Sequence, residues 1–115
     1  MPLIKVQLAT EPDREKAEGL LKSFSRMLAE ETGKPEKYVM VLLERGQALL
    51  GGESGPAAFV DVRGIGGFNR QVNTSITRAI CEILKSRLGI EPDRVYVTFS
   101  DVPAENWGWN SRTFA

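Results

Sequence analysis

The sequence contains no histidine, so it lacks the side chain that most often serves as a general base near neutral pH. Sites that pair serine or cysteine with histidine, and zinc sites built on histidine, are therefore excluded. Three kinds of base remain: a perturbed carboxylate, a desolvated lysine, and the amino terminus, whose reference pKa is about 7.7 to 8.0. The amino terminus, where Pro2 follows Met1, is thus one candidate for catalysis.

Cysteine, an excess of one charge and long apolar runs are also absent or scarce. Cys81 is the only cysteine, which excludes a disulfide framework and a cysteine-rich metal site. Lysine plus arginine and aspartate plus glutamate both total 15, without the basic run that binds nucleic acid. No apolar stretch approaches the roughly 18 residues that span a bilayer, and the amino terminus does not resemble a secretory signal. We therefore expect a cytoplasmic protein with neither a nucleic-acid nor a membrane partner.

The residues that are present predict a single domain, residues 1–115, made of two similar halves and a tail. The halves cover about residues 1–50 and 57–102, and each has the pattern of a strand, a helix and a second strand. A shift of 56 positions aligns the apolar helical residues of the two halves, for example Leu20 with Ile76. We expect the elements of the first half at 2–8 (strand), from Thr10 to Gly33 (helix) and at 38–43 (strand).

Two strand–helix–strand units of this kind predict an α/β (α+β) fold with a four-stranded mixed sheet. Because such crossovers are right-handed in about 98% of cases, both helices can lie on one face of the sheet. The other face is then bare, although the segment VMVLL (39–43) is apolar at every position, as in strands that are buried on both sides. Either the chain's own loops and tail cover this face or another copy does. We favour association through the sheet, and hence a homo-oligomer.

Aromatic residues are concentrated in the carboxyl-terminal tail, residues 103–115. Trp107, Trp109 and Phe114 all lie between positions 105 and 115. Large aromatic side chains dominate burial in cores and interfaces, so we expect this tail to be docked rather than solvated. Docking on the chain's own sheet and docking on a neighbouring copy are both compatible with the sequence.

Each polar candidate for function also has a structural interpretation. Proline is tolerated at the first position of a strand, as for Pro2, and a lysine just after a helix, such as Lys34, complements the helix dipole. The segment GIGG (64–67) is typical of a turn that ends a strand, and it lacks the full spacing of a dinucleotide-binding motif. Tyr96 and Thr98 share one face of a strand, which ordinary packing explains equally well.

The combination of segments is more informative than any one of them. MP at the start, TGKPEKYVMV, GPAA, GIGG, PDRVYV and GWNSRTFA follow one another along the whole chain. Together they resemble the macrophage migration inhibitory factor (MIF) family of the tautomerase superfamily. The resemblance implies a homotrimer whose three sheets surround a central channel, with the helices outside. It also implies keto–enol tautomerisation of phenylpyruvate-like 2-oxo acids and of dopachrome derivatives, without a cofactor or a metal.

The resemblance also implies roles for individual residues. Pro2, freed by removal of Met1, would be the catalytic base. Lys34 and the backbone N–H of Ile65 would bind the substrate, and Tyr96 would come from the adjacent subunit. Thr98 stands where the family has an asparagine that contacts the substrate, and it is shorter with only one donor. The tail would contribute two further substrate-binding residues, the bulky Trp107 and Phe114.

One departure from the family pattern and two alternatives remain. The family's Cys-Ala-Leu-Cys motif is AAFV at 57–60, so thiol redox activity is not expected. The protein could instead be a binding or signalling protein that keeps the trimer but catalyses no physiological reaction. It could also carry out another reaction of the superfamily, such as decarboxylation or dehalogenation.

Overall fold

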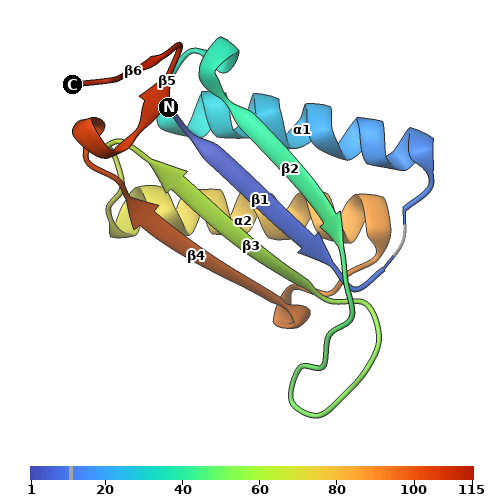
Figure 1. Ribbon diagram of the computed structural model, residues 1–115. Helices are drawn as coiled ribbons and strands as arrows, with labels where there is room; N and C mark the ends of the chain where they lie inside the picture. Colours follow the sequence, from blue (N-terminus) through green and yellow to red (C-terminus); the bar gives the residue numbers. More distant parts are fainter. Residues whose placement is uncertain (11) are drawn as a thin grey trace.

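The computed structural model describes residues 1–10 and 12–115, which form one mixed sheet covered on one face by two helices (Figure 1). The strand order is β2-β1-β3-β4. The strands are β1 (Leu3–Leu8), β2 (Met40–Arg45), β3 (Ala58–Gly64) and β4 (Val95–Asp101), and the helices are α1 (Arg14–Thr32) and α2 (Arg70–Leu88). Short elements complete the fold: η1 (Glu36–Tyr38), η2 (Pro92–Arg94), η3 (Ala104–Asn106), β5 (Gly108–Trp109) and β6 (Arg112–Thr113).

The strand pairing confirms the predicted mixed sheet of two strand–helix–strand units. β1 is parallel to β2 and antiparallel to β3, and β3 is parallel to β4. In the register, Leu3 lies opposite both Met40 and Arg63. The start of β1 is therefore at the same end of the sheet as the ends of β3 and β4. Figure 1 shows both chain termini at this end.

The two helices confirm the internal repeat. Each has 19 residues, and each is followed by a glycine in the left-handed region, Gly33 and Gly89, both with φ of 69°. The predicted start of the first helix at Thr10 is wrong, because the helix begins at Arg14. Asp13 is its N-cap and accepts a hydrogen bond from the Lys16 amide at 2.8 Å. Aspartate is the better N-cap of the two residue types, since its carboxylate accepts more readily than a threonine hydroxyl.

The core lies between the helices and one face of the sheet. The apolar side chains spaced along each helix are in contact with the alternate residues of the strands, as the sequence periodicity predicts. Neither helix in the described part of the chain is long and apolar enough to cross a membrane. The fully buried residues of the core include Leu20, Phe24, Leu28, Ile76, Ile80, Leu84, Ile4, Val6, Val60 and Val62.

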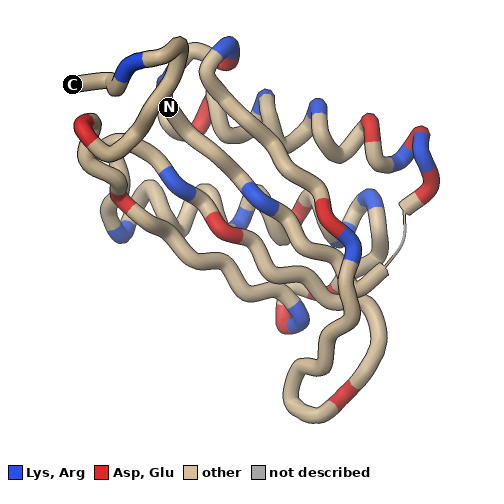
Figure 2. Tube along the Cα trace, viewed as in Figure 1, with Lys and Arg blue, Asp and Glu red and all other residues tan. Residues whose placement is uncertain are grey.

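The opposite face of the sheet is open in the single chain. Met40 is 58% exposed and Tyr96 is 65% exposed, and both lie on this face. The strand at 39–43 is thus covered on its helix side only, and the chain's own loops and tail leave the other side open. Charged residues of alternating sign also cross the open face (Figure 2), with Lys5 3.7 Å from Glu44 and Arg63 3.0 Å from Asp61.

Candidate active site

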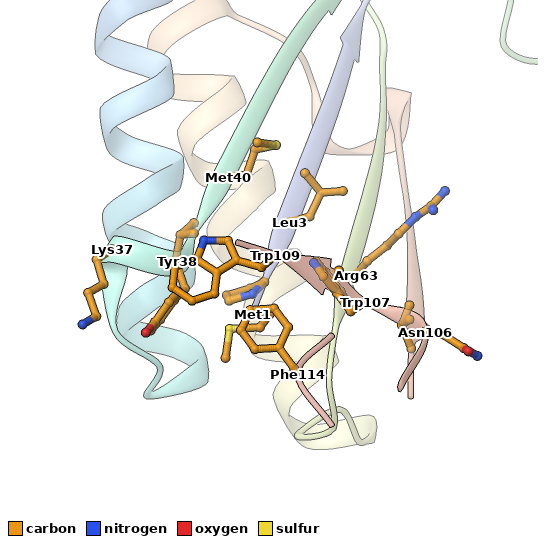
Figure 3. Close-up of a pocket in the computed structure, with 14 residues that line it drawn as sticks. Met1, Leu3, Lys37, Tyr38, Met40, Arg63, Asn106, Trp107, Trp109 and Phe114 are labelled. Carbon is orange, nitrogen blue, oxygen red and sulfur yellow. The ribbon is translucent and has the colours of Figure 1, made fainter. Parts of the chain in front are cut away.

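A cavity of about 540 Å³ opens at the end of the sheet where β1 begins (Figure 3). Four separate segments line it: the amino terminus, the stretch from η1 into β2, the end of β3, and the tail. These segments meet because β1 is the central partner of both β2 and β3, so that its first residues lie between theirs. Pro2, Trp107 and Phe114, three of the residues implied by the sequence, all line this cavity.

Pro2 is buried at the inner end of the cavity. Its carbonyl accepts a hydrogen bond from the Met40 amide at 3.1 Å, which ties the chain start to β2. While Met1 is attached, the Pro2 nitrogen is an amide and has no basicity. The amine present is that of Met1, and its pKa is lowered from the ordinary value by burial and, to a smaller extent, by the positive charge of Lys34. Pro2 itself is buried, whereas Met1 is half-buried.

Lys34 lies beside this amino terminus. It directly follows the glycine that ends α1, but its ammonium does not bond the carbonyls at the end of that helix. Instead, Lys34 Nζ donates to the carbonyl of Ile65 at 2.7 Å and to that of Gly66 at 3.3 Å. Burial lowers the pKa of Lys34, and the negative charge of Asp101 opposes this shift. Lys34 thus joins the end of α1 to the turn after β3.

The turn at 64–67 accepts the hydrogen bonds of the Lys34 ammonium, although neither its residues nor Lys34 line the cavity. Gly66 and Gly67 have φ of 69° and 85°, a region that favours glycine, and the Gly66 amide donates to Asp101 Oδ1 at 2.8 Å. A Cβ on Gly64 would lie 3.0 Å from the Phe68 ring, so a larger residue there would push against that ring. The amide of Ile65 has no hydrogen-bond partner in the described part of the chain. It is available as a donor to a ligand.

Aromatic rings from the tail form one wall of the cavity. The β5–β6 hairpin turns through Asn110 and Ser111, and it stacks Trp109 on Phe114 with ring centroids 5.7 Å apart. The edge of Tyr38 meets both rings, at centroid distances of 5.3 and 6.2 Å. The tail therefore docks on its own chain. Figure 3 shows Met1 beside these rings, so its side chain takes up part of the aromatic pocket.

Several lining residues are not among the site residues that the sequence indicates, and Tyr38 and Arg63 are two of them. The strand start predicted at Tyr38 is wrong, because Tyr38 ends η1 and β2 begins at Met40; the Tyr38 ring supplies the aromatic partner of the tail. Arg63 is on the open face of β3, next to β1, and lines the cavity. The alternation in the segment AAFVDVRG would have placed Phe59, Asp61 and Arg63 on one face. The pairing with the start of β1 was not visible in the sequence.

The single chain does not bring Tyr96 and Thr98 to Pro2. Tyr96 is paired with Phe59, which is paired with Gln7, five residues along β1 from Pro2. At about 3.3 Å per residue this is roughly 16 Å. Tyr96 lines a second cavity of about 250 Å³ at the other end of the sheet, and Thr98 Oγ1 donates to Asp61 Oδ1 at 3.3 Å.

No group of three or more aspartate, glutamate, cysteine or histidine side chains within residues 1–10 and 12–115 is placed to hold a metal ion. The polar groups that line or adjoin the cavity are the amino terminus, Lys34, Lys37, Arg63 and backbone amides, beside the aromatic rings.

Comparisons with known proteins identify the family of the chain. The sequence model of the family "Macrophage migration inhibitory factor (MIF)" matches residues 1–115. The macrophage migration inhibitory factor of Meriones unguiculatus is 38% identical over 99 residues, which cover 85% of this chain and 86% of that protein. The homologue from Prochlorococcus marinus has a crystal structure that aligns with a TM-score of 0.93 at 38% identity, covering 98% of this chain and 99% of that chain. The Toxoplasma gondii protein aligns with a TM-score of 0.93 at 32% identity, over 97% and 99% of the two chains. This chain belongs to the macrophage migration inhibitory factor family.

Proposed function

We propose that this protein is a cofactor-independent keto–enol tautomerase that acts on phenylpyruvate-like 2-oxo acids, with Pro2 as its base once Met1 has been removed. The observation that supports the proposal most strongly is the enclosure of the amino terminus in a cavity with aromatic walls, beside Lys34. An uncharged amine in such a place is suited to general base catalysis, because both burial and the neighbouring cation disfavour its protonated form.

The reaction would move one proton between carbon and oxygen. The Pro2 nitrogen takes a proton from C3 of the 2-oxo acid, and the electron pair of the broken C–H bond forms the C2–C3 double bond of an enolate. Lys34 and the Ile65 amide stabilise the negative charge of the carboxylate and of the enolate oxygen. The protonated Pro2 then returns the proton to that oxygen, which gives the enol and restores the free amine. The aromatic wall of Tyr38, Trp109 and Phe114 holds the phenyl ring.

The activity should depend on pH through the free amine. For the chain without Met1, kcat/KM with phenylpyruvate is expected to rise with pH and to level off above the pKa of the Pro2 amine. Because burial and Lys34 both lower the pKa of the amino terminus, the midpoint should lie below the reference range of about 7.7 to 8.0. The variant Lys34→Gln should move the midpoint to higher pH, since one of the two causes is removed.

The test is a pH profile of enol formation followed by absorbance, on protein whose intact mass shows that Met1 is absent. Arg78→Gln, on the exposed outer surface of α2, is the control that should keep the wild-type midpoint. A sample without Met1 and without turnover at any pH would rule out the tautomerase and favour the alternative, a binding or signalling protein with the same fold. 2-Oxo-3-pentynoate offers a second test, since an uncharged Pro2 nitrogen would add to its activated triple bond and raise the protein mass by that of one molecule.

The proposal includes a homotrimer, in which Tyr96 of one copy completes the site of the next. One observation supports an assembly: the open face exposes apolar side chains such as Met40 and Phe59. Tyr96 lies at the far end of the sheet from Pro2, so the role proposed for it requires a second copy. A protein that needs residues from two copies for each site should show complementation between two inactive variants. The charged pair Lys5–Glu44 on the open face would lie towards the central channel.

We expect that Pro2→Gly and Tyr96→Ala are each impaired alone, and that a refolded equal mixture regains activity. In a random mixture about a quarter of the sites receive Pro2 from one variant and Tyr96 from the other. The measurement is kcat per site before and after mixing, with sedimentation to follow the oligomer. Activity that equals the average of the two variants would contradict the shared site.

A further inference from the structure

The cavity contains positive charge that the proposed reaction does not require. Two of the side chains that line it are cationic, Lys37 and Arg63, and none of the lining residues is acidic. Figure 3 shows these two residues on opposite sides of the aromatic groups Tyr38 and Trp109. Lys34, which lies near the amino terminus but does not line the cavity, is a third cation. A phenylpyruvate molecule carries one negative charge, which Lys34 is placed to meet.

Arg63 is held in one orientation by a neighbouring carboxylate. Its Nε donates to Asp61 Oδ2 at 3.0 Å, and its Nη2 lies 3.0 Å from the same oxygen. The Asp61 side chain is only 14% exposed, and its other oxygen accepts from Thr98, whereas the Arg63 side chain is 52% exposed. The Nη1 group of Arg63 has no hydrogen-bond partner among the described residues. Arg63 is therefore a half-exposed cation, paired with Asp61 on one side, whose Nη1 donors remain open to a ligand.

The cationic groups of Lys34 and Arg63 are both bonded to residues near the end of β3. Lys34 Nζ is bonded to the Ile65 carbonyl, and the Arg63 guanidinium lies on Asp61, four positions earlier. At about 3.3 Å per residue, backbone positions 61 and 65 are roughly 13 Å apart, and this sets the approximate spacing of the two positive groups. Pro2 precedes Leu3, which pairs with Arg63, so the base lies between the two cations. A ligand with an anionic group at each end could meet both of them with Pro2 beside it.

We infer that Arg63 is a specificity-determining residue that favours aromatic 2-oxo acids with a second anionic group at the end remote from the 2-oxo acid. This inference rests on the proposed function and names the substrate class of the same site. The 2-oxo acid end binds at Lys34 and Ile65, and the ring lies along the aromatic wall. The distal carboxylate accepts hydrogen bonds from the Arg63 guanidinium group. A charge-assisted hydrogen bond of this kind is stronger than one to a neutral group of the same size.

The test compares two substrates that differ only in the charge of the distal group, 4-carboxyphenylpyruvate and 4-carbamoylphenylpyruvate. We expect kcat/KM of the protein without Met1 to be at least roughly tenfold higher for the carboxylate, the factor of one hydrogen bond to a charged group. Arg63→Gln should remove this ratio, and Arg63→Lys should keep part of it because a cation remains. Arg78→Gln should leave the ratio at the wild-type value.

A binding measurement separates this inference from the tautomerase proposal. The probes are 3-(4-carboxyphenyl)propanoate and its carbamoyl analogue, which have no 2-oxo group and cannot react, and the readout is the fluorescence of Trp107 and Trp109 in the cavity. Tighter binding of the dianion that is lost in Arg63→Gln supports the inference even if no substrate turns over. Turnover without a preference for the carboxylate in the wild-type protein overturns the inference and leaves the tautomerase intact. If Arg63→Gln does not fold, the wild-type ratio and the Arg63→Lys variant still decide.

Discussion

Replacing Pro2 by glycine in the chain without Met1 is expected to lower kcat/KM for phenylpyruvate about 10²-fold or more. The buried proline ring holds its nitrogen in place through its packing, whereas glycine has no ring to pack and leaves the first residue free to take many conformations. A reacting atom displaced by about 1 Å can cost this factor. The carbonyl of residue 2, which accepts from the Met40 amide, is kept in the variant, so the fold should be unaffected.

The chain that keeps Met1 provides a matched comparison. There the Pro2 nitrogen is an amide, so the general base is absent, and a loss of about 10²- to 10⁴-fold is expected. The Met1 side chain also takes up part of the aromatic pocket, which should weaken substrate binding as well. Both samples are assayed with the same enol absorbance measurement, after circular dichroism has shown that they are folded. Full activity of Pro2→Gly would remove Pro2 from the mechanism.

Replacing Phe24 by alanine is expected to lower the free energy of unfolding by about 3 to 5 kcal/mol. Phe24 lies on the sheet side of α1 and is fully buried in the core cluster of helices and strands. Removing its ring deletes apolar contacts and leaves a cavity that the close-packed neighbours can fill only in part. Such a loss is a large fraction of the stability of a domain of this size.

The measurement is unfolding in urea, at one protein concentration for all samples because an assembly would add to the apparent stability. Lys22→Ala, on the exposed side of the same helix, is the control and should change the free energy by about 0.5 kcal/mol or less. A value for Phe24→Ala as small as that of the control would mean that the ring is not part of the core.

The main elements of the fold were predictable from the sequence because each depends on local periodicity. The two helices have the same length and the same offset as the apolar repeat that aligned Leu20 with Ile76. Their ends were also marked locally, by Gly33 and Gly89. The sequence predicts the start of α1 too early, because Thr10 and Asp13 both have capping side chains and local sequence does not decide between them.

The functional site was predictable only in part, and the residues that were missed share one cause. Pro2 and Lys34 were implied by a resemblance carried by short segments that contain them. Tyr38 and Arg63 carry no local signal, because one lies in an ordinary apolar stretch and the other in an ordinary alternating strand. Their role arises when the start of β1 is inserted between β2 and β3.

By itself, the sequence determined the class of fold, the internal repeat, the absence of a histidine base and the aromatic character of the tail. These properties follow from residue types and from spacings of two and about four positions, which act over one strand or one helical turn. Only the tertiary structure decided that the tail docks on Tyr38 of its own chain, that Lys34 bonds the turn at Ile65, and that Arg63 lies across from Leu3. Each of these contacts joins residues far apart in the chain, and strand register, which no local pattern contains, sets which of them meet.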